Sequence, residues 1–258
     1  MQPVFVLVHS PSVGPLTWGP VANALDMRQH ESVVPSLLDV ADAGPPFWPR
    51  VVEVVNAAMS RLDQGQCVLL VAHSNAGLFV PLLVGHAVRP VRCCLFVDAA
   101  LPARAGQTPV APTELLDFLR GKVTDGRLPP WTEWWDEEDV APLFTDAATR
   151  AAVTAEEPRL PFGYYEQSVP VSTGWDHDVA CGYLLFGPPY EEMAADARSR
   201  GWLVEELVGQ HLHQLVDPDA TADRLITMAN SLALRDTWRP VSEADRSAAH
   251  RVCRSLES

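Results

Sequence analysis

Short apolar runs alternate with amphipathic segments along most of this chain. The runs are rich in β-branched residues and apolar on both faces, which is typical of buried strands. They lie at residues 4–9, 32–37, 67–73, 92–98, 182–187 and 202–208. Between them, apolar residues recur at helical spacing over residues 16–27, 47–62, 78–84, 191–200 and 219–234. The alternation predicts an α/β fold, in which helices cover both faces of a mostly parallel central sheet.

One long segment, residues 103–175, interrupts this alternation. It holds no predicted strand and is rich in proline and tryptophan. A segment of this length requires structure of its own. We expect it to form a cap of short helices over the carboxyl ends of the strands, inserted between core residues 1–102 and 176–235. Residues 236–258 are predicted to be a polar C-terminal tail.

The third apolar run ends abruptly at Ser74, and a helical pattern follows. A strand, a sharp turn and a helix with serine at the turn form a nucleophile elbow. Residues two before and two after the serine must be small, because a larger side chain would strike the adjacent strand or helix. Ala72 and Ala76 occupy these positions, and Gly77 follows. Ser74 is therefore the predicted nucleophile.

Length and charge exclude several classes of protein. With 258 residues and 47% hydrophobic content, the chain can bury the core of one enzyme-sized domain. Its net charge of −14 argues against nucleic acid and anionic membrane surfaces as partners. No apolar run approaches the roughly 20 residues of a membrane span. The N-terminus lacks the basic region of a signal peptide. A small molecule is the expected partner.

The cysteines indicate a reducing compartment. Their number is odd, and four of the five lie in predicted strands, which suits buried thiols better than disulfides: Cys67, Cys93, Cys94, Cys181 and Cys253. We therefore expect a cytoplasmic location. No C-x-x-C pair occurs, and neither a metal nor a cofactor is predicted. The Ala- and Val-rich composition with a single lysine indicates a GC-rich bacterial genome.

Three motifs, in the same order along the chain, resemble the α/β-hydrolase superfamily, in particular its small capped, esterase-like members. His9–Ser12 follows the first strand and precedes Trp18, similar to the H-G and W of the family. The elbow at Ser74 is the second motif. Gly209–His211 follows the last strand like the family's G-x-H, and Asp217–Pro218 begins the closing helix. The resemblance covers nearly the whole chain outside the inserted segment and the tail.

The resemblance implies a triad in which a histidine takes the proton of Ser74. His211 matches the family position. His213 is the rival, but in an extended loop it faces the opposite way. The two histidines also fit an H-x-H metal pair, although no nearby carboxylate motif supports one. We therefore expect His211 to be the catalytic base.

Two acids compete for the third position of the triad. Asp98 ends the strand that follows the nucleophile helix, at the carboxyl edge of the predicted sheet. The family alternative lies after the next strand, where Pro188 and Pro189 fill the turn and Glu191 comes next. Glu191 also fits an acidic first helical turn, which the helix dipole favours. Asp98 is the preferred acid.

The oxyanion hole departs from the family pattern. One donor is expected to be the backbone N–H of Asn75, which follows the nucleophile. Ser10 replaces the family glycine, and Pro11, which has no N–H, occupies the position that normally gives the second donor. The second donor is then a neighbouring N–H such as that of Ser12, or a hydroxyl of Ser10 or Ser12.

Six aromatic residues of the inserted segment lie above the predicted pocket: Trp131, Trp134, Trp135, Tyr164, Tyr165 and Trp175. We expect most of them to pack the cap onto the core and one or two to contact substrate. Trp131, Trp134 and Trp135 are the candidates for substrate contact.

The sequence favours a serine hydrolase that cleaves an ester, thioester or related carbonyl bond of an apolar small molecule. The departure at Ser10 and Pro11 motivates one alternative, a cyclase, lyase or dehydratase of specialised metabolism on the same fold. A non-enzymatic ligand binder is a further alternative, which a complete triad disfavours. Fold alone does not choose among these functions.

Overall fold

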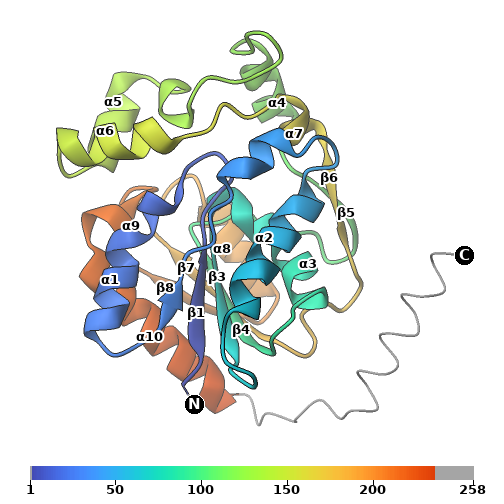
Figure 1. Cartoon of the computed structure of the whole chain (residues 1–258), viewed down its shortest axis with the longest axis vertical. Coiled ribbons are helices and arrows are strands. Elements are labelled where there is room, and N and C mark those ends of the chain that lie inside the picture. Colours follow the sequence, from blue (N-terminus) through green and yellow to red (C-terminus); the bar gives the residue numbers. More distant parts are fainter. Residues whose placement is uncertain (1, 236–258) are drawn as a thin grey trace, which may run out of the picture.

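Six parallel strands form the centre of the molecule, in the order β2-β1-β3-β4-β7-β8 (Figure 1). They are β1 (Val4–Val8), β2 (Ser32–Val33), β3 (Val68–His73), β4 (Val91–Val97), β7 (Ala180–Leu185) and β8 (Leu203–Glu206). The structure, a computed structural model, describes residues 2–235. The sheet confirms the α/β fold that the alternation of apolar runs and helical patterns predicts.

Helices cover both faces of this sheet, and each face has its own apolar core. Phe5 and Leu7 of β1 pack with α1 (Gly19–Met27) and α10 (Pro218–Arg235). Val6 and Val8 point to the opposite face, where α2 (Trp48–Ser60), α3 (Val80–Gly85) and α8 (Glu191–Ser199) lie. Short 3₁₀ turns connect these elements: η1 (Pro15–Thr17), η2 (Leu38–Asp42) and η3 (Ser74–Phe79). Within residues 2–235, no helix has the length and apolar character needed to cross a membrane.

The second strand is shorter than expected. The pattern predicts a strand over residues 32–37, whereas β2 contains only Ser32 and Val33. Pro35 lies just beyond, and proline has no N–H to donate to a neighbouring strand. The apolar residue Leu37 is nevertheless fully buried. The end of this segment therefore packs in the core although it does not pair with a neighbouring strand.

The inserted segment differs from the sequence prediction in one respect: it contains two strands. β5 (Gly106–Pro109) and β6 (Ser168–Val171) pair antiparallel in a separate sheet. Each is four residues long and contains a proline, so neither shows the apolar run of a buried strand. Between them lie α4 (Thr113–Arg120), η4 (Trp131–Glu133), α5 (Glu137–Val140), η5 (Ala141–Leu143), α6 (Ala147–Glu156) and α7 (Gly163–Glu166).

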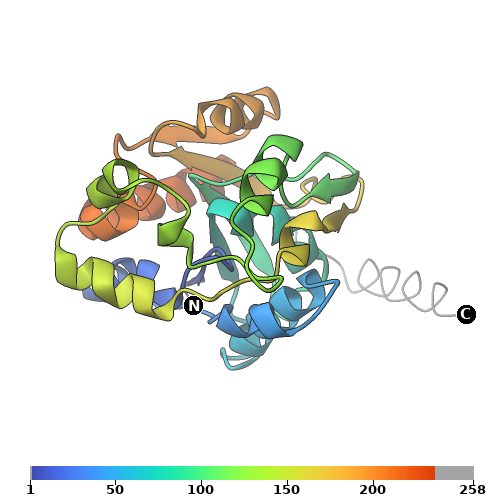
Figure 2. The ribbon, with the colours of Figure 1, turned by 90° about the horizontal axis from the view of Figure 1, so that it is seen from above.

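These elements lie beyond the carboxyl ends of the central strands. Figure 1 shows α4, α5, α6 and α7 above the sheet, and Figure 2 shows the segment spread across it from above. The last short helix, α9 (His213–Val216), lies next to α10. The expected C-terminal tail, residues 236–258, falls outside the described residues.

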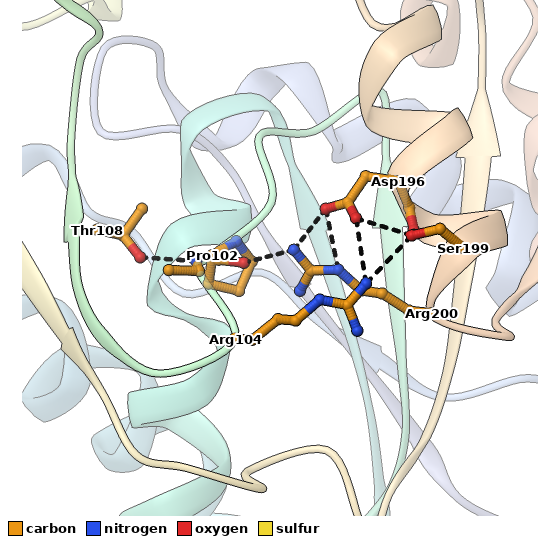
Figure 3. A network of polar contacts seen from close by, with 7 residues as sticks. Pro102, Arg104, Thr108, Asp196, Ser199 and Arg200 are labelled. Atoms are coloured by element: carbon orange, nitrogen blue, oxygen red, sulfur yellow. Dashed lines mark hydrogen bonds and ion pairs between the residues drawn. The ribbon is translucent and has the colours of Figure 1, made fainter.

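A polar network ties the start of the inserted segment to α8 (Figure 3). Arg200 donates to the carbonyl of Pro102 at 2.8 Å and binds Asp196 at 2.5 Å. Arg104 reaches Ser199 at 3.1 Å and the same Asp196 at 3.5 Å. Arg200 is almost fully buried, and a charge-assisted hydrogen bond in such surroundings is stronger than an exposed one. The network therefore holds the chain shortly after β4, where Asp98 lies.

Candidate active site

Ser74 occupies a sharp turn between β3 and η3. Its φ is +57°, in the left-handed region, which costs a residue other than glycine on the order of 1–3 kcal/mol. Ala72 and Ala76 are fully buried on either side. At Gly77, a Cβ would lie 2.2 Å from the carbonyl oxygen of Ala100, so only glycine fits there. The structure thus contains the strained elbow that the small residues predict.

His211 and Asp98 complete a hydrogen-bonded chain with this serine. Nε2 of His211 lies 3.0 Å from Oγ of Ser74, and Nδ1 lies 2.7 Å from Oδ2 of Asp98. Asp98 follows β4, is fully buried and also has a positive φ, of 42°. Its other carboxylate oxygen accepts the N–H of Phe186 at 3.0 Å and that of Gly187 at 3.5 Å. The carboxylate is therefore fixed by the backbone of β7 and its turn.

The two rival residues lie elsewhere. Glu191 is exposed at the first position of α8. His213 begins α9, and its ring packs against Phe186 with centroids 5.4 Å apart. A Cβ at Gly209 would lie 2.3 Å from the His213 ring, which explains the need for glycine in this loop. Of the two histidines, the structure brings only His211 to Ser74.

Aromatic rings enclose the His211 imidazole. Tyr190 stacks on it with centroids 4.9 Å apart and an interplanar angle of 8°, and the Tyr190 hydroxyl lies 3.5 Å from Oγ of Ser74. Burial raises the pKa of Tyr190 to about 12, so its phenol is neutral and can donate. The ring centroids of His73 and His211 are 4.6 Å apart. Nε2 of His73 lies 2.9 Å from the backbone carbonyl oxygen of His211. Burial lowers the pKa of His73 well below its ordinary value, so this ring is neutral.

The expected oxyanion residues lie at the ends of two neighbouring strands. Val8 of β1 is in register with Ala72 of β3, so the residues that follow both strands lie side by side. Ser10 and Ser12 are both buried, with their hydroxyl oxygens 3.3 Å apart.

Two adjacent tyrosines of α7 contact Asn75 and Ser12, two of the residues expected to form the oxyanion hole. Tyr164 donates to Oδ1 of Asn75 at 2.5 Å, and the hydroxyl of Tyr165 is hydrogen-bonded to that of Ser12. Asn75 also donates from Nδ2 to the carbonyl of Val110 at 3.1 Å.

The three tryptophans proposed to contact substrate have different surroundings. Trp131 is half-buried, with its ring centroid 6.0 Å from that of His211. Trp134 is buried, donates to the carbonyl of Pro129 at 2.8 Å and packs against Tyr165. Trp135 is 38% exposed and stacks on Phe118. Only Trp131 lies beside the histidine.

Tyr190 is the residue at this site that sequence reasoning missed. It follows Pro188 and Pro189 in the turn after β7, where the family pattern predicts a carboxylate and not a phenol. An aromatic residue at the carboxyl end of a central strand was the available signal. The contacts of Tyr164 and Tyr165 had no signal, because they depend on how the inserted segment folds back.

The chain is similar to known proteins in sequence and in fold. No family model matches the chain. A curated rice protein, Esterase PIR7B of Oryza sativa subsp. japonica, is 30% identical over 174 residues, which are 64% of this chain and 60% of that protein. The match therefore spans less than two thirds of the rice protein.

Solved structures resemble the chain over most of its length. One is an extracellular α/β-hydrolase from a Paenibacillus species, described as a structural and functional homologue of tobacco salicylic acid binding protein 2 (17% identity, TM-score 0.67, 88% of this chain and 99% of that one). Another is a tomato methylketone synthase I variant in complex with β-ketoheptanoate (15% identity, TM-score 0.73, 90% and 98%). A third is a pyrethroid hydrolase variant (14% identity, TM-score 0.68, 90% and 99%). The chain has the α/β-hydrolase fold.

A buried carboxylate holds the turn that carries Trp131. Oε2 of Glu157 accepts the N–H and the hydroxyl of Thr132, both at 2.9 Å. Its other oxygen, Oε1, is buried without a hydrogen-bond partner. Burial raises the pKa of Glu157 from 4.5 to about 7, and the nearby Glu133 and Glu156 add to this effect, while the Thr132 hydrogen bonds oppose it.

We predict that Glu157 makes stability depend on pH. Its folded pKa is above its unfolded pKa, so the folded state binds more protons between pH about 4.5 and about 7. The free energy of unfolding should fall as pH rises through this window, by up to about 3 kcal/mol from this residue. Urea unfolding at several pH values should show a flatter profile for Glu157→Gln than for the wild type.

Glu138→Gln is the matched control, because Glu138 is an exposed acid of the same segment. For this variant, the free energy of unfolding should depend on pH as it does in the wild type. The same pH dependence for Glu157→Gln and the wild type would contradict the prediction.

Proposed function

We propose that this chain is a serine hydrolase that cleaves an ester, thioester or related carbonyl bond of an apolar small molecule. The observation that carries the proposal is the continuous hydrogen-bonded chain from Asp98 through His211 to Ser74, with the serine on a strained elbow. Serine is a weak nucleophile at neutral pH and needs an adjacent base held by a third group. The names of the rice esterase and of the hydrolase structures support the same class of reaction.

In this mechanism Oγ of Ser74 attacks the carbonyl carbon while its proton moves to Nε2 of His211. The carbonyl electrons move to the oxygen, which the backbone N–H of Asn75 and a second donor stabilise. When the tetrahedral intermediate collapses, His211 gives its proton to the leaving oxygen or sulfur. Water then attacks the acyl-serine, His211 again acts as the base, and the acid product leaves. Asp98 keeps His211 in the required tautomer and stays ionised.

We further propose that residues 103–175 are the cap of this enzyme and bind the apolar part of the substrate. Trp131 supports this, because its ring lies beside His211. Each aromatic ring buries roughly 150–250 Å², so few residues can bind a bulky apolar group. The same cap would exclude water and strengthen the electrostatic interactions at Ser74.

The cell compartment belongs to this proposal too. Four cysteines in the described part of the chain are free thiols, and three of them are buried: Cys67, Cys93, Cys94 and Cys181. Free thiols at this number are typical of a reducing compartment, which supports a cytoplasmic enzyme.

A second candidate is a non-hydrolytic enzyme on the same fold, such as a lyase or dehydratase. Pro11 supports it, because the position lacks the N–H that acyl transfer normally uses. The likeness to methylketone synthase I is compatible with it. Serine reactivity separates the two candidates.

We predict that a fluorophosphonate probe labels the wild type at Ser74 and that Ser74→Ala is not labelled. The elbow and the His211 hydrogen bond make this hydroxyl nucleophilic, whereas no other serine side chain within residues 2–235 hydrogen-bonds a histidine. Intact-protein mass spectrometry would measure the labelling, and hydrolysis of p-nitrophenyl esters would measure turnover. Ser60→Ala, at an exposed serine of α2, is the control and should label fully. Full labelling of Ser74→Ala would refute the nucleophile, and a wild type that is not labelled at Ser74 would favour the second candidate.

We predict that the acid of the triad is Asp98 and not Glu191. Asp98→Asn should lower kcat by about 10⁴-fold, because the amide cannot stabilise the imidazolium and favours the wrong tautomer. Glu191→Gln should leave kcat within about twofold, since Glu191 is exposed on α8. Steady-state ester kinetics at one pH would measure both. The reverse ranking of the two variants would place the acid after β7.

We predict a preference for bulky apolar esters over acetate. Trp131→Ala should raise KM for a long or aromatic acyl ester more than KM for the acetate, since only the larger group reaches the ring. Trp135→Ala should have a smaller effect, because Trp135 stacks on Phe118 at the surface. Kinetics over an ester series would test this. Acetate as the best substrate, with Trp131→Ala behaving like the wild type, would show that the tryptophan is a packing residue.

A further inference from the structure

Two neighbouring tyrosines on α7 reach the two sides of the oxyanion region. Tyr164 is fully buried and donates to the side chain of Asn75, the residue after the nucleophile. Tyr165 is 3% exposed, and its hydroxyl bonds to Ser12, in the loop after β1. Their ring centroids are 4.9 Å apart. One rigid dipeptide therefore connects the two segments that the sequence identifies as sources of oxyanion donors.

The Asn75 side is closed by a ring of hydrogen bonds. Tyr164 donates to Asn75, and Asn75 donates to the carbonyl of Val110 at 3.1 Å. The N–H of Val110 donates to the carbonyl of Gln167 at 3.0 Å, and Gln167 donates back to the carbonyl of Tyr164 at 3.1 Å. Asn75 has no freedom to rotate without breaking two bonds of this ring. The ring therefore anchors the side chain of Asn75, and with it the residue whose backbone N–H is the expected donor.

The Ser12 side offers a donor where Pro11 does not. A buried tyrosine hydroxyl needs an acceptor, and Ser12 is the partner that Tyr165 has within the described residues. If Tyr165 donates to Oγ of Ser12, and Ser10 donates to the same oxygen at 3.3 Å, both lone pairs of that oxygen are occupied. The proton of Ser12 is then left to bind another acceptor. Burial raises the pKa of Tyr165 above its ordinary value, so the phenol keeps the proton that it donates.

We propose that Tyr164 and Tyr165 are positioning residues that build the oxyanion hole from the cap, with the backbone N–H of Asn75 and the hydroxyl of Ser12 as its two donors. This rests on the proposed hydrolase function. Oxyanion donors act by being held in place before charge develops on the substrate oxygen. In the family pattern, a glycine after β1 helps to form the oxyanion hole. In this chain α7 of the inserted segment takes over that role and sets the distance between the Asn75 N–H and the Ser12 hydroxyl. The contacts of α7 with Asn75 and Ser12 are then part of the oxyanion hole itself.

The test uses Tyr164→Phe and Tyr165→Phe, which keep the buried rings and remove only the hydroxyls. Loss of a whole oxyanion donor lowers kcat by about 10²–10³-fold, so a mispositioned donor should lower it by about tenfold to hundredfold. KM should stay within about twofold, because the substrate binds before the oxyanion forms. Thr154→Val removes a hydroxyl of α6 that contacts only Thr132, and is expected to behave like the wild type.

A tetrahedral inhibitor separates positioning from general loosening of the cap. An alkyl trifluoromethyl ketone adds the Ser74 oxygen to its carbonyl carbon, passes the serine proton to His211 and places an oxyanion in the hole. Its inhibition constant should rise in each variant by the factor by which kcat/KM falls. The inhibition constant of the corresponding alcohol, which forms no oxyanion, should not change. Equal weakening of both inhibitors would overturn the proposal.

Ser12→Ala and Asn75→Ala remove the other partner of each hydrogen bond, in case a buried tyrosine variant does not fold. In double variants, Tyr165→Phe should have no further effect on top of Ser12→Ala, nor Tyr164→Phe on top of Asn75→Ala. If the losses in kcat of the two single variants add up in the double variant, the tyrosine does not act through its partner and the proposal is wrong. A wild type that neither hydrolyses esters nor binds the ketone would overturn the hydrolase function and the tyrosine roles together. An active wild type with fully active tyrosine variants would overturn the tyrosine roles alone.

Discussion

The left-handed backbone of Ser74 is the constraint on which the rest of the site depends. The turn projects the serine beyond the end of β3, and it brings the start of η3 so close to the residues after β4 that Gly77 lies against the carbonyl of Ala100. The N–H of Ala100 in turn donates to the carbonyl of Ser74 at 3.0 Å. Strain of this kind persists only where the surroundings fix it. Here the buried β3 and the loop after β4 do so, and the same loop carries Asp98.

Parallel pairing of the strands turns this local strain into a site. β1, β3, β4 and β7 are neighbours, and their carboxyl ends meet at one edge of the sheet. Ser12, Ser74, Asp98 and Tyr190 each follow one of these four strands. The strand order therefore gathers the candidate oxyanion residue, the candidate nucleophile, the candidate acid and an aromatic neighbour of His211 without any long-range recognition between their side chains.

Neutral groups surround His211, the histidine of the described residues that hydrogen-bonds a carboxylate. His73 and Tyr190 flank His211 closely, and burial keeps both uncharged near neutral pH. Between these neutral rings, His211 hydrogen-bonds Ser74 on one side and Asp98 on the other. The turn after β7 contributes Tyr190 and the N–H groups that bind Asp98, so this turn supports the proposed triad even though its candidate acid follows β4.

Sequence by itself determined the sheet-and-helix order and the sharp turn at Ser74, because these depend on local patterns: apolar runs and small residues beside a turn. It proposed Asp98 from its place at a strand end and His211 from the resemblance to a known family. It did not reveal β5 and β6, since two short proline-containing strands gain stability only by pairing across about sixty residues of chain. It also did not reveal the contacts of Tyr190, Tyr164 and Tyr165. Tyr164 and Tyr165 meet Asn75 and Ser12 only once the inserted segment has folded over the strand ends. Tyr190 meets Ser74 only once β3 and β7 lie in one sheet. Tertiary structure alone decided them, because such contacts join residues that no local pattern relates.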